Sequence, residues 1–121
     1  MRFNPEFLNR PRKRDNPEGR TQLQIIHYLN SIGAVVGKTR TMGVKRGNSY
    51  CYDRYTMRGK ADLECFHKGI MYAIEVKAPG KSIEEKSDQD IYRSLFHSPP
   101  SRIFIEADGL SDVQKIIQNN P

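Results

Sequence analysis

Two short apolar segments joined by a tight turn constrain the fold of this chain more than any other feature. Residues 61–66 and 70–77 are rich in apolar side chains, and His67-Lys68-Gly69 between them is typical of a hairpin turn. The sequence therefore predicts an antiparallel pair of strands. Residues thirteen positions apart in the chain become neighbours across such a pair.

Charged residues occupy one end of this predicted hairpin. Asp62 lies at the start of the first strand, and Glu75 and Lys77 close the second. Residues two apart in a strand point the same way, so Glu75 and Lys77 share a face, whereas Ile74 and Val76 take the other. Carboxylates are the oxygen ligands that Mg²⁺ prefers, and an ammonium can offset charge that develops on a phosphate. Two interpretations follow: a metal-dependent phosphodiesterase site, or a hairpin whose solvent side carries charges.

The other apolar patterns predict an α/β domain around the hairpin. Leu23, Ile26 and Leu29 recur at helical spacing and, with the adjacent Ile25 and Ile32, predict a buried stripe on the first helix. The expected elements are a helix at 18–31, a strand at 34–42, the two hairpin strands, a helix at 87–97, a strand at 102–106 and a last helix capped by Ser111. This αβββαβα order predicts one domain over residues 18–121, preceded by a basic arm at 1–17 that becomes ordered against a partner.

Basic residues concentrate in one central segment. Residues 38–60 contain seven Lys or Arg and one Asp, whereas residues 61–121 contain seven basic and ten acidic side chains. A polyanion is the natural partner of such a patch, and a solvated basic loop without a ligand is the alternative. Within or beside an insert at 43–59, the candidate nucleic-acid-binding residues are Arg40, Lys45, Arg46, Arg54, Arg58 and Lys60.

Aromatic residues share the insert with these basic side chains. Tyr50, Tyr52 and Tyr55 either stack on unpaired bases or pack against the protein or across a dimer interface. Two cysteines, Cys51 and Cys65, are too few for a disulfide framework and fit a reducing compartment. The chain has no run of membrane-spanning length, so we expect a soluble intracellular protein with no membrane partner.

Four motifs, in this order, resemble those of a known nuclease family. The motifs are Glu18-x-x-x-Gln22 with Tyr28-Leu29, Gly59-Lys60-Ala61-Asp62-Leu63, Ile74-Glu75-Val76-Lys77-Ala78-Pro79-Gly80, and Ser87-Asp88-Gln89. Together they resemble the virus-type replication-repair nuclease (VRR-NUC) domain of the PD-(D/E)XK superfamily, in its stand-alone phage form. Where the family has proline, this chain has Ala61, which changes loop stiffness but no ligand. The family's Ser-x-x-Gln is one residue shorter here and arrives slightly late.

The resemblance implies a restriction-endonuclease-like core, with a central mixed sheet flanked by helices, and a metal site. Asp62 and Glu75 would bind Mg²⁺ or Mn²⁺, with the backbone carbonyl of Val76 as a further ligand. A bound ion would activate the attacking water, which Lys77 would position.

Two further residues have open roles. Glu18 would bind a second metal or orient waters, or is a helix-terminus acid favoured by the helix dipole. Gln89 would hydrogen-bond a water or phosphate, or is a polar residue at the start of a helix.

The implied activity is that of a structure-specific DNA endonuclease resembling Holliday-junction resolvases. Cutting two opposed strands of branched DNA requires two symmetric sites, so the resemblance implies a homodimer. The implied location is the cytoplasm of a bacterium or of a phage-infected cell. The alternatives are a restriction-like endonuclease, a flap or repair nuclease, and a non-catalytic nucleic-acid-binding module.

Overall fold

The computed structural model of the chain describes residues 16–39, 44–46, 49–51 and 58–120, with 44–46 and 49–51 described by their backbone only. The elements along these residues are α2 (Pro17–Ser31), β1 (Val35–Lys38), β2 (Val44–Arg46), β3 (Ser49–Cys51), β4 (Leu63–His67), β5 (Ile70–Val76), α3 (Asp88–Phe96), β6 (Arg102–Ala107) and α4 (Leu110–Gln118). Apart from the β2–β3 hairpin, which was not predicted, the order is the expected αβββαβα.

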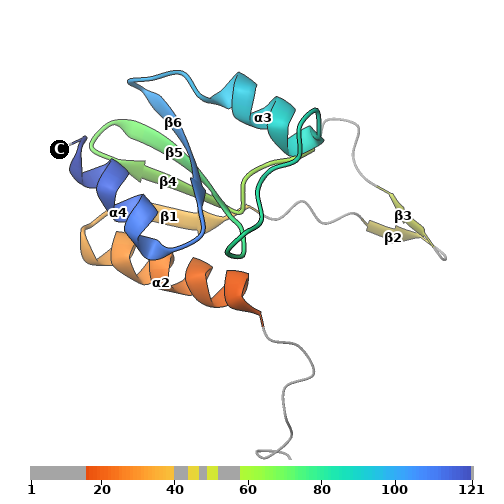
Figure 1. Ribbon diagram of the computed structural model, residues 1–121, viewed down its shortest axis with the longest axis horizontal. Helices are drawn as coiled ribbons and strands as arrows, with labels where there is room; N and C mark the ends of the chain where they lie inside the picture. Colours follow the sequence, from red (N-terminus) through yellow and green to blue (C-terminus); the bar gives the residue numbers. More distant parts are fainter. Residues whose placement is uncertain (1–15, 40–43, 47–48, 52–57, 121) are drawn as a thin grey trace, which may run out of the picture.

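Four strands form one mixed sheet in the order β1-β4-β5-β6 (Figure 1). The predicted hairpin is confirmed: β4 and β5 pair antiparallel, with Leu63 opposite Ile74, and Gly69 in the turn has a φ of +79°. β6 runs parallel to β5, and α3 lies in the crossover between them. The remaining strands, β2 and β3, form a separate two-stranded sheet.

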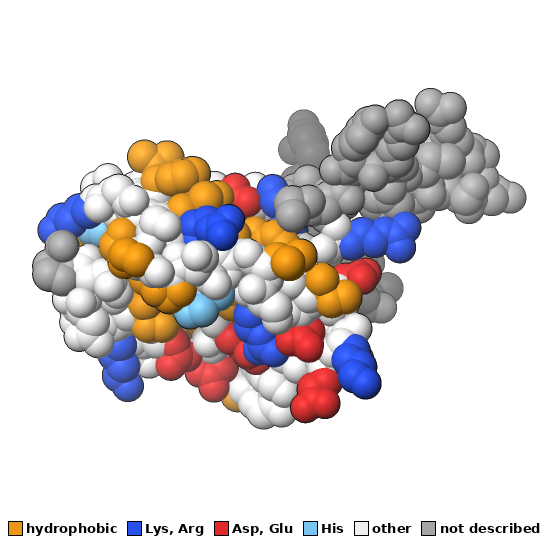
Figure 2. Space-filling model, turned by 90° about the horizontal axis from the view of Figure 1, so that it is seen from above, with side chains coloured by type: hydrophobic (Ala, Val, Ile, Leu, Met, Phe, Trp, Pro, Cys, Tyr) orange, Lys and Arg blue, Asp and Glu red, His pale blue; other side chains and the backbone are white. Residues whose placement is uncertain are grey.

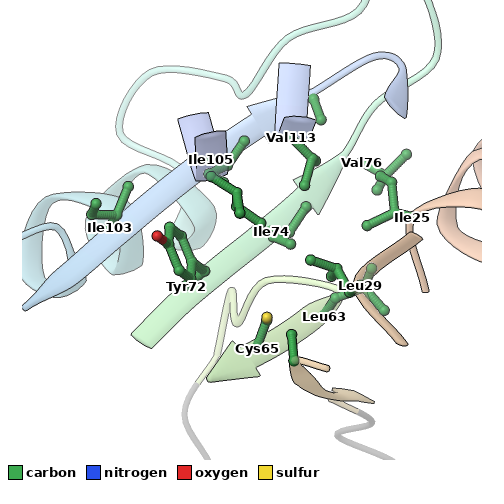
Figure 3. Close-up of a cluster of buried hydrophobic side chains, with 13 residues drawn as sticks. Ile25, Leu29, Leu63, Cys65, Tyr72, Ile74, Val76, Ile103, Ile105 and Val113 are labelled. Carbon is green, nitrogen blue, oxygen red and sulfur yellow. The ribbon is translucent and has the colours of Figure 1, made fainter. Parts of the chain in front are cut away.

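Helices cover both faces of the sheet, with α2 and α4 on one face and α3 on the other (Figure 1). Strand alternation separates the faces, because Ile74 and Val76 of β5 pack towards α2 and α4, whereas Ala73 packs towards α3. The labelled side chains of the larger cluster (Figure 3) are Ile25, Leu29, Leu63, Cys65, Tyr72, Ile74, Val76, Ile103, Ile105 and Val113. The smaller cluster holds Tyr92, Phe96 and Phe104 under α3.

The first helix begins as its sequence dictates but buries a narrower stripe than expected. Asn16 caps α2 by accepting a hydrogen bond from the Gly19 N–H at 2.9 Å. Ile25 and Leu29 are fully buried, which contributes ~1.5–3 kcal/mol each. Leu23, predicted to be buried, is 52% exposed, because the line through Ile25 and Leu29 is the one that faces the sheet.

The later helices fit their predicted positions except at one cap. Ser87 caps α3 by accepting a hydrogen bond from Asp90 N–H at 3.2 Å. α4 begins one residue before Ser111, with Gly109 as its N-cap, so the predicted Ser111 cap is wrong. The Asp112 carboxylate instead accepts a hydrogen bond from the Asp108 N–H at 3.1 Å and closes the first turn. Within the described residues, the helices are too short or too polar to cross a membrane.

Candidate active site

Asp62 is held at the end of the hairpin by the strands on both sides of it. On one side, the Thr39 N–H, just after β1, donates to the Asp62 carbonyl at 3.0 Å, and the Thr39 hydroxyl donates to the Ala61 carbonyl. On the other side, the Asp62 carboxylate oxygen Oδ2 accepts a hydrogen bond from the Val76 N–H at 3.0 Å. The hairpin register therefore brings Asp62 beside the end of β5, as the sequence predicted.

Glu75 is a buried carboxylate with one unsatisfied oxygen. Its side chain faces α3, where Oε1 accepts a hydrogen bond from Gln89 Nε2 at 2.8 Å, while Oε2 has no hydrogen-bond partner among the described residues. Burial, and after it the charge of the neighbouring Asp62, raise the pKa of Glu75 to about 7. A buried carboxylate oxygen without a donor is costly when ionised, so this position favours either a proton or a cation.

Lys77 and Gln89 complete a chain of contacts that begins at Glu75. The Lys77 ammonium donates to Gln89 Oε1 at 2.8 Å and lies 3.6 Å from Glu75 Oε1. The Gln89 amide thus bridges the acid and the amine, donating to one and accepting from the other. This contact restrains the Lys77 side chain, which is only 20% exposed.

Gly59 holds the start of α3 close to the segment that carries Asp62, directly before β4. Its φ is +74°, and a Cβ added there would lie 2.3 Å from the carbonyl carbon and oxygen of Asp88. A side chain would therefore push α3 away and move Gln89 with it. Glycine is therefore required at position 59, because the backbone there approaches the backbone of Asp88 and Gln89 too closely for a side chain.

The first helix adds two polar side chains to the same region. Glu18 Oε1 accepts a hydrogen bond from the Ala78 N–H at 3.0 Å, which links the start of α2 to the end of β5. Burial raises the pKa of Asp62, the Glu18 charge adds to this effect, and hydrogen bonds from the Val76 N–H and the Gln22 side chain oppose it. All five sequence-predicted catalytic residues therefore lie in one region. Gln22, which belongs to the first of the four motifs but was assigned no role, lies there as well.

A second set of contacts behind the site was not predicted. Glu106 of β6 lies beside Glu75 in the parallel register. Its carboxylate accepts from the Ile83 N–H at 3.1 Å and from Arg93 Nη1 at 3.2 Å, and Arg93 also pairs with Asp90 at 2.6 Å. Gln89 and Arg93 are one helical turn apart, so two acids on adjacent strands are each held by one residue of α3. The i, i+4 spacing of Gln89 and Arg93 is visible in the sequence. It could not predict these contacts, because they also depend on the register that places Glu106 beside Glu75.

A cleft of about 590 Å³ opens beside these residues. Glu18, Lys77 and, from the start of α3, Gln89 are among its lining residues. Glu18, Lys77 and Gln89 are thus within reach of a ligand from solvent, whereas Asp62 and Glu75 do not line the cleft.

The predicted nucleic-acid-binding residues are only partly described. Arg58 is exposed in the turn that precedes Gly59, and Lys60 forms an ion pair with Glu64 at 3.0 Å. Lys45 and Arg46 lie in β2, where only the backbone is described, as it is for Tyr50 in β3. Arg40, Arg54, Tyr52, Tyr55 and residues 1–15 of the predicted arm lie outside the described residues. A grip on nucleic acid by this insert stays a prediction.

The donor set fits a hard divalent cation that completes its coordination with other oxygens. Asp62 and Glu75 offer carboxylates, and one oxygen of Glu75 has no hydrogen-bond donor. Across the described part of the chain, no three His, Cys, Asp or Glu side chains gather closely enough to hold a metal by themselves. Mg²⁺ commonly keeps several waters and takes only one or two carboxylates, so two acids are sufficient. The Val76 carbonyl stays a predicted ligand.

Comparison with known proteins supports the fold. No family model and no curated protein sequence matches the chain. A solved structure described as "VRR_NUC domain" matches 88% of this chain and 100% of its own length, with a TM-score of 0.59 and 18% sequence identity. The chain therefore has the fold of this domain, and the predicted fold is confirmed.

Proposed function

We propose that this chain, which shares the fold of a VRR_NUC domain, is a metal-dependent endonuclease that hydrolyses phosphodiester bonds in DNA. The observation that carries the proposal is the convergence of polar side chains from separate segments: Glu18, Asp62, Glu75, Lys77 and Gln89. Three of them, Glu18, Lys77 and Gln89, line one cleft. Fold alone does not determine activity, so the proposal depends on the chemistry of these groups.

Asp62 and Glu75 would hold the metal ion, together with the Val76 carbonyl. When bound, Mg²⁺ or Mn²⁺ would polarise the phosphate and supply a nucleophilic water at neutral pH. The unsatisfied oxygen of Glu75 supports this assignment, because a cation there would offset the cost of burying the charge. Glu18 contributes indirectly by fixing Ala78, and its charge makes the pocket more attractive to a cation.

Lys77 would orient the attacking water and offset charge that develops on the phosphate. Its ammonium is already held by Gln89 at 2.8 Å, so little reorganisation is needed when substrate arrives. Gln89 would act as the residue that positions both Lys77 and Glu75, since it contacts each of them.

The same residues argue against a module that only binds nucleic acid. A phosphate-binding surface gains nothing from buried acids, and Asp62 and Glu75 both have raised pKa values because of their burial. A divalent cation requirement would separate the two classes, because simple phosphate binding does not need a metal.

We further propose that the substrate is branched DNA, with the four-way junction as the preferred form, and that the protein acts as a homodimer. Two opposed strands of a junction must be cut, which a pair of symmetric sites accomplishes. The basic side chains that border Asp62, Arg58 and Lys60, would contact the DNA backbone without reading its sequence.

The test is cleavage of end-labelled DNA by the purified protein in Mg²⁺ or Mn²⁺. Four-way junction, flap, splayed-arm and linear duplex substrates of shared sequence are compared, with Lys77→Ala and Asp62→Asn as inactive controls whose folding is checked by circular dichroism. Symmetric nicks near the junction centre support the proposal. Preferential cutting of flaps would indicate a repair nuclease, and fixed cuts in linear duplex a restriction-like enzyme. Intact DNA in every lane would overturn the assignment.

A further inference from the structure

The chain reverses direction directly after Lys77 and brings a second lysine beside it. The Lys81 N–H donates to the Ala78 carbonyl at 3.0 Å, and Gly80 has a φ of +84°. Pro79 followed by a glycine with positive φ, closed by this hydrogen bond, is the pattern of a type II turn. The turn fixes where Lys81 leaves the backbone.

The segment that carries Lys81 is anchored at both ends. The Ala78 N–H donates to Glu18 at 3.0 Å, and the Ile83 N–H donates to Glu106 at 3.1 Å. Ile83 is also buried in the hydrophobic cluster under α3. Lys81 lies between these two anchors, so its position is held although its side chain is exposed.

Within the described part of the chain, the Lys81 side chain has no partner, unlike those of Lys77 and Lys60. The Lys77 ammonium is engaged by Gln89, and the Lys60 ammonium by Glu64. Among the described residues, nothing forms an ion pair or a side-chain hydrogen bond with Lys81. Its positive charge is therefore available to a ligand.

Lys77 and Lys81 are the two residues shared by a pair of clefts, of about 590 and 260 Å³, that open on either side of them. The acidic side chains that line the clefts are Glu18, Glu84 and Asp88 in the larger and Glu106, Asp108 and Asp112 in the smaller. In the view of Figure 2, acidic and basic side chains are intermingled along one edge of the molecule. A phosphate that approaches Lys77 by either route meets acids, so an unpaired cation is needed on its path.

The geometry points to Lys81 as the anchor of a second phosphate of the substrate, next to the one that is cleaved. This inference rests on the proposed nuclease function and assigns to Lys81 binding of the DNA backbone rather than bond breaking. Lys77 faces the reacting phosphate, whereas Lys81 neutralises a neighbouring one and offsets the surrounding acids. Such a contact carries no sequence information and releases counterions, so it makes binding dependent on salt.

The test compares Lys81→Gln with Lys86→Gln, which removes the same charge from the same loop. Lys86 is exposed and lines neither cleft. Binding of a fluorescent four-way junction is measured by anisotropy from 50 to 300 mM NaCl, without divalent metal, and cleavage kinetics are measured separately in Mg²⁺. The anisotropy experiment requires no cleavage, so it is informative even when the proposed activity is absent.

Lys81→Gln is expected to weaken binding about three- to tenfold and to lower the slope of log K against log salt by about 0.9 relative to Lys86→Gln. In the cleavage assay its effect lies mainly in KM rather than in kcat, and Lys81→Arg restores binding. Equal salt slopes for Lys81→Gln and Lys86→Gln would overturn the inference. So would a loss confined to kcat, which would place Lys81 in the chemical step, or an absence of measurable DNA binding by the unaltered protein.

Discussion

The raised pKa of Glu75 predicts that the protein loses stability as pH rises. Folding moves the pKa of this carboxyl from its ordinary 4.5 to about 7, chiefly through burial. Between these values the folded protein keeps a proton that the unfolded chain releases, so the free energy of unfolding falls with increasing pH. At ~1.4 kcal/mol per pKa unit, the full penalty above pH 7 is ~3 kcal/mol.

Glu75→Gln should remove this penalty, because the amide is neutral and its oxygen can still accept from Gln89. Urea unfolding at pH 5, 6, 7 and 8, without divalent metal, gives the free energy for each protein. We expect the variant to exceed the unaltered protein by less than ~1 kcal/mol at pH 5 and by up to ~3 kcal/mol at pH 8. Loss of the 3.6 Å contact with Lys77 reduces that gain.

Glu106→Gln is the matched control, because it removes the neighbouring carboxylate on β6 and leaves Glu75 unchanged. It should lower stability by breaking the contact with Arg93, yet retain the decline between pH 5 and 8. A stability difference between Glu75→Gln and the unaltered protein that stays constant over this pH range would refute the reasoning.

Three further predictions concern the site. Gly59→Ala should destabilise the protein by ~3 kcal/mol or more in urea, against ~1 kcal/mol for Gly69→Ala, because both have positive φ but only Gly59 has backbone within 3 Å of the new methyl group. Gln89→Ala should reduce cleavage ~10–100-fold, since it releases both Lys77 and Glu75, and should cost ~1–3 kcal/mol of stability because a buried Glu75 oxygen loses its donor; an unchanged rate in cleavage kinetics would contradict a positioning role. At limiting Mg²⁺, kcat/KM should rise about tenfold per pH unit up to about pH 7 as Glu75 loses its proton, and a flat profile would argue against its role as a ligand.

The hairpin and its acids could be predicted because the signals are local. His67-Lys68-Gly69 fixes the turn, and the alternation on either side fixes which side chains share a face. Once the two strands pair, Asp62 must lie near Glu75, and no information from elsewhere in the chain is needed. The same locality explains why the Ser87 cap was found.

Contacts between segments that are distant in the chain could not be predicted from such local sequence signals. Glu18 reaches Ala78 across sixty positions, and Glu106 meets Arg93 only because β6 returns parallel to β5. The turn that brings Lys81 beside Lys77 is visible in the sequence, but the lack of a partner for Lys81 among the described residues is not. The Leu23 error has the same origin, because the sheet, rather than helical periodicity, decides which line of α2 is buried.

The most direct test of the site is a titration with Mn²⁺ at pH 8, followed by electron paramagnetic resonance of the free ion. The unaltered protein and Lys77→Ala should both bind the ion, because Lys77 is proposed to act on water and phosphate rather than on the metal. Asp62→Asn and Glu75→Gln should each bind at least ~10-fold more weakly. Equal affinity in all four proteins, or no binding by the unaltered one, would contradict a metal pocket formed by Asp62 and Glu75.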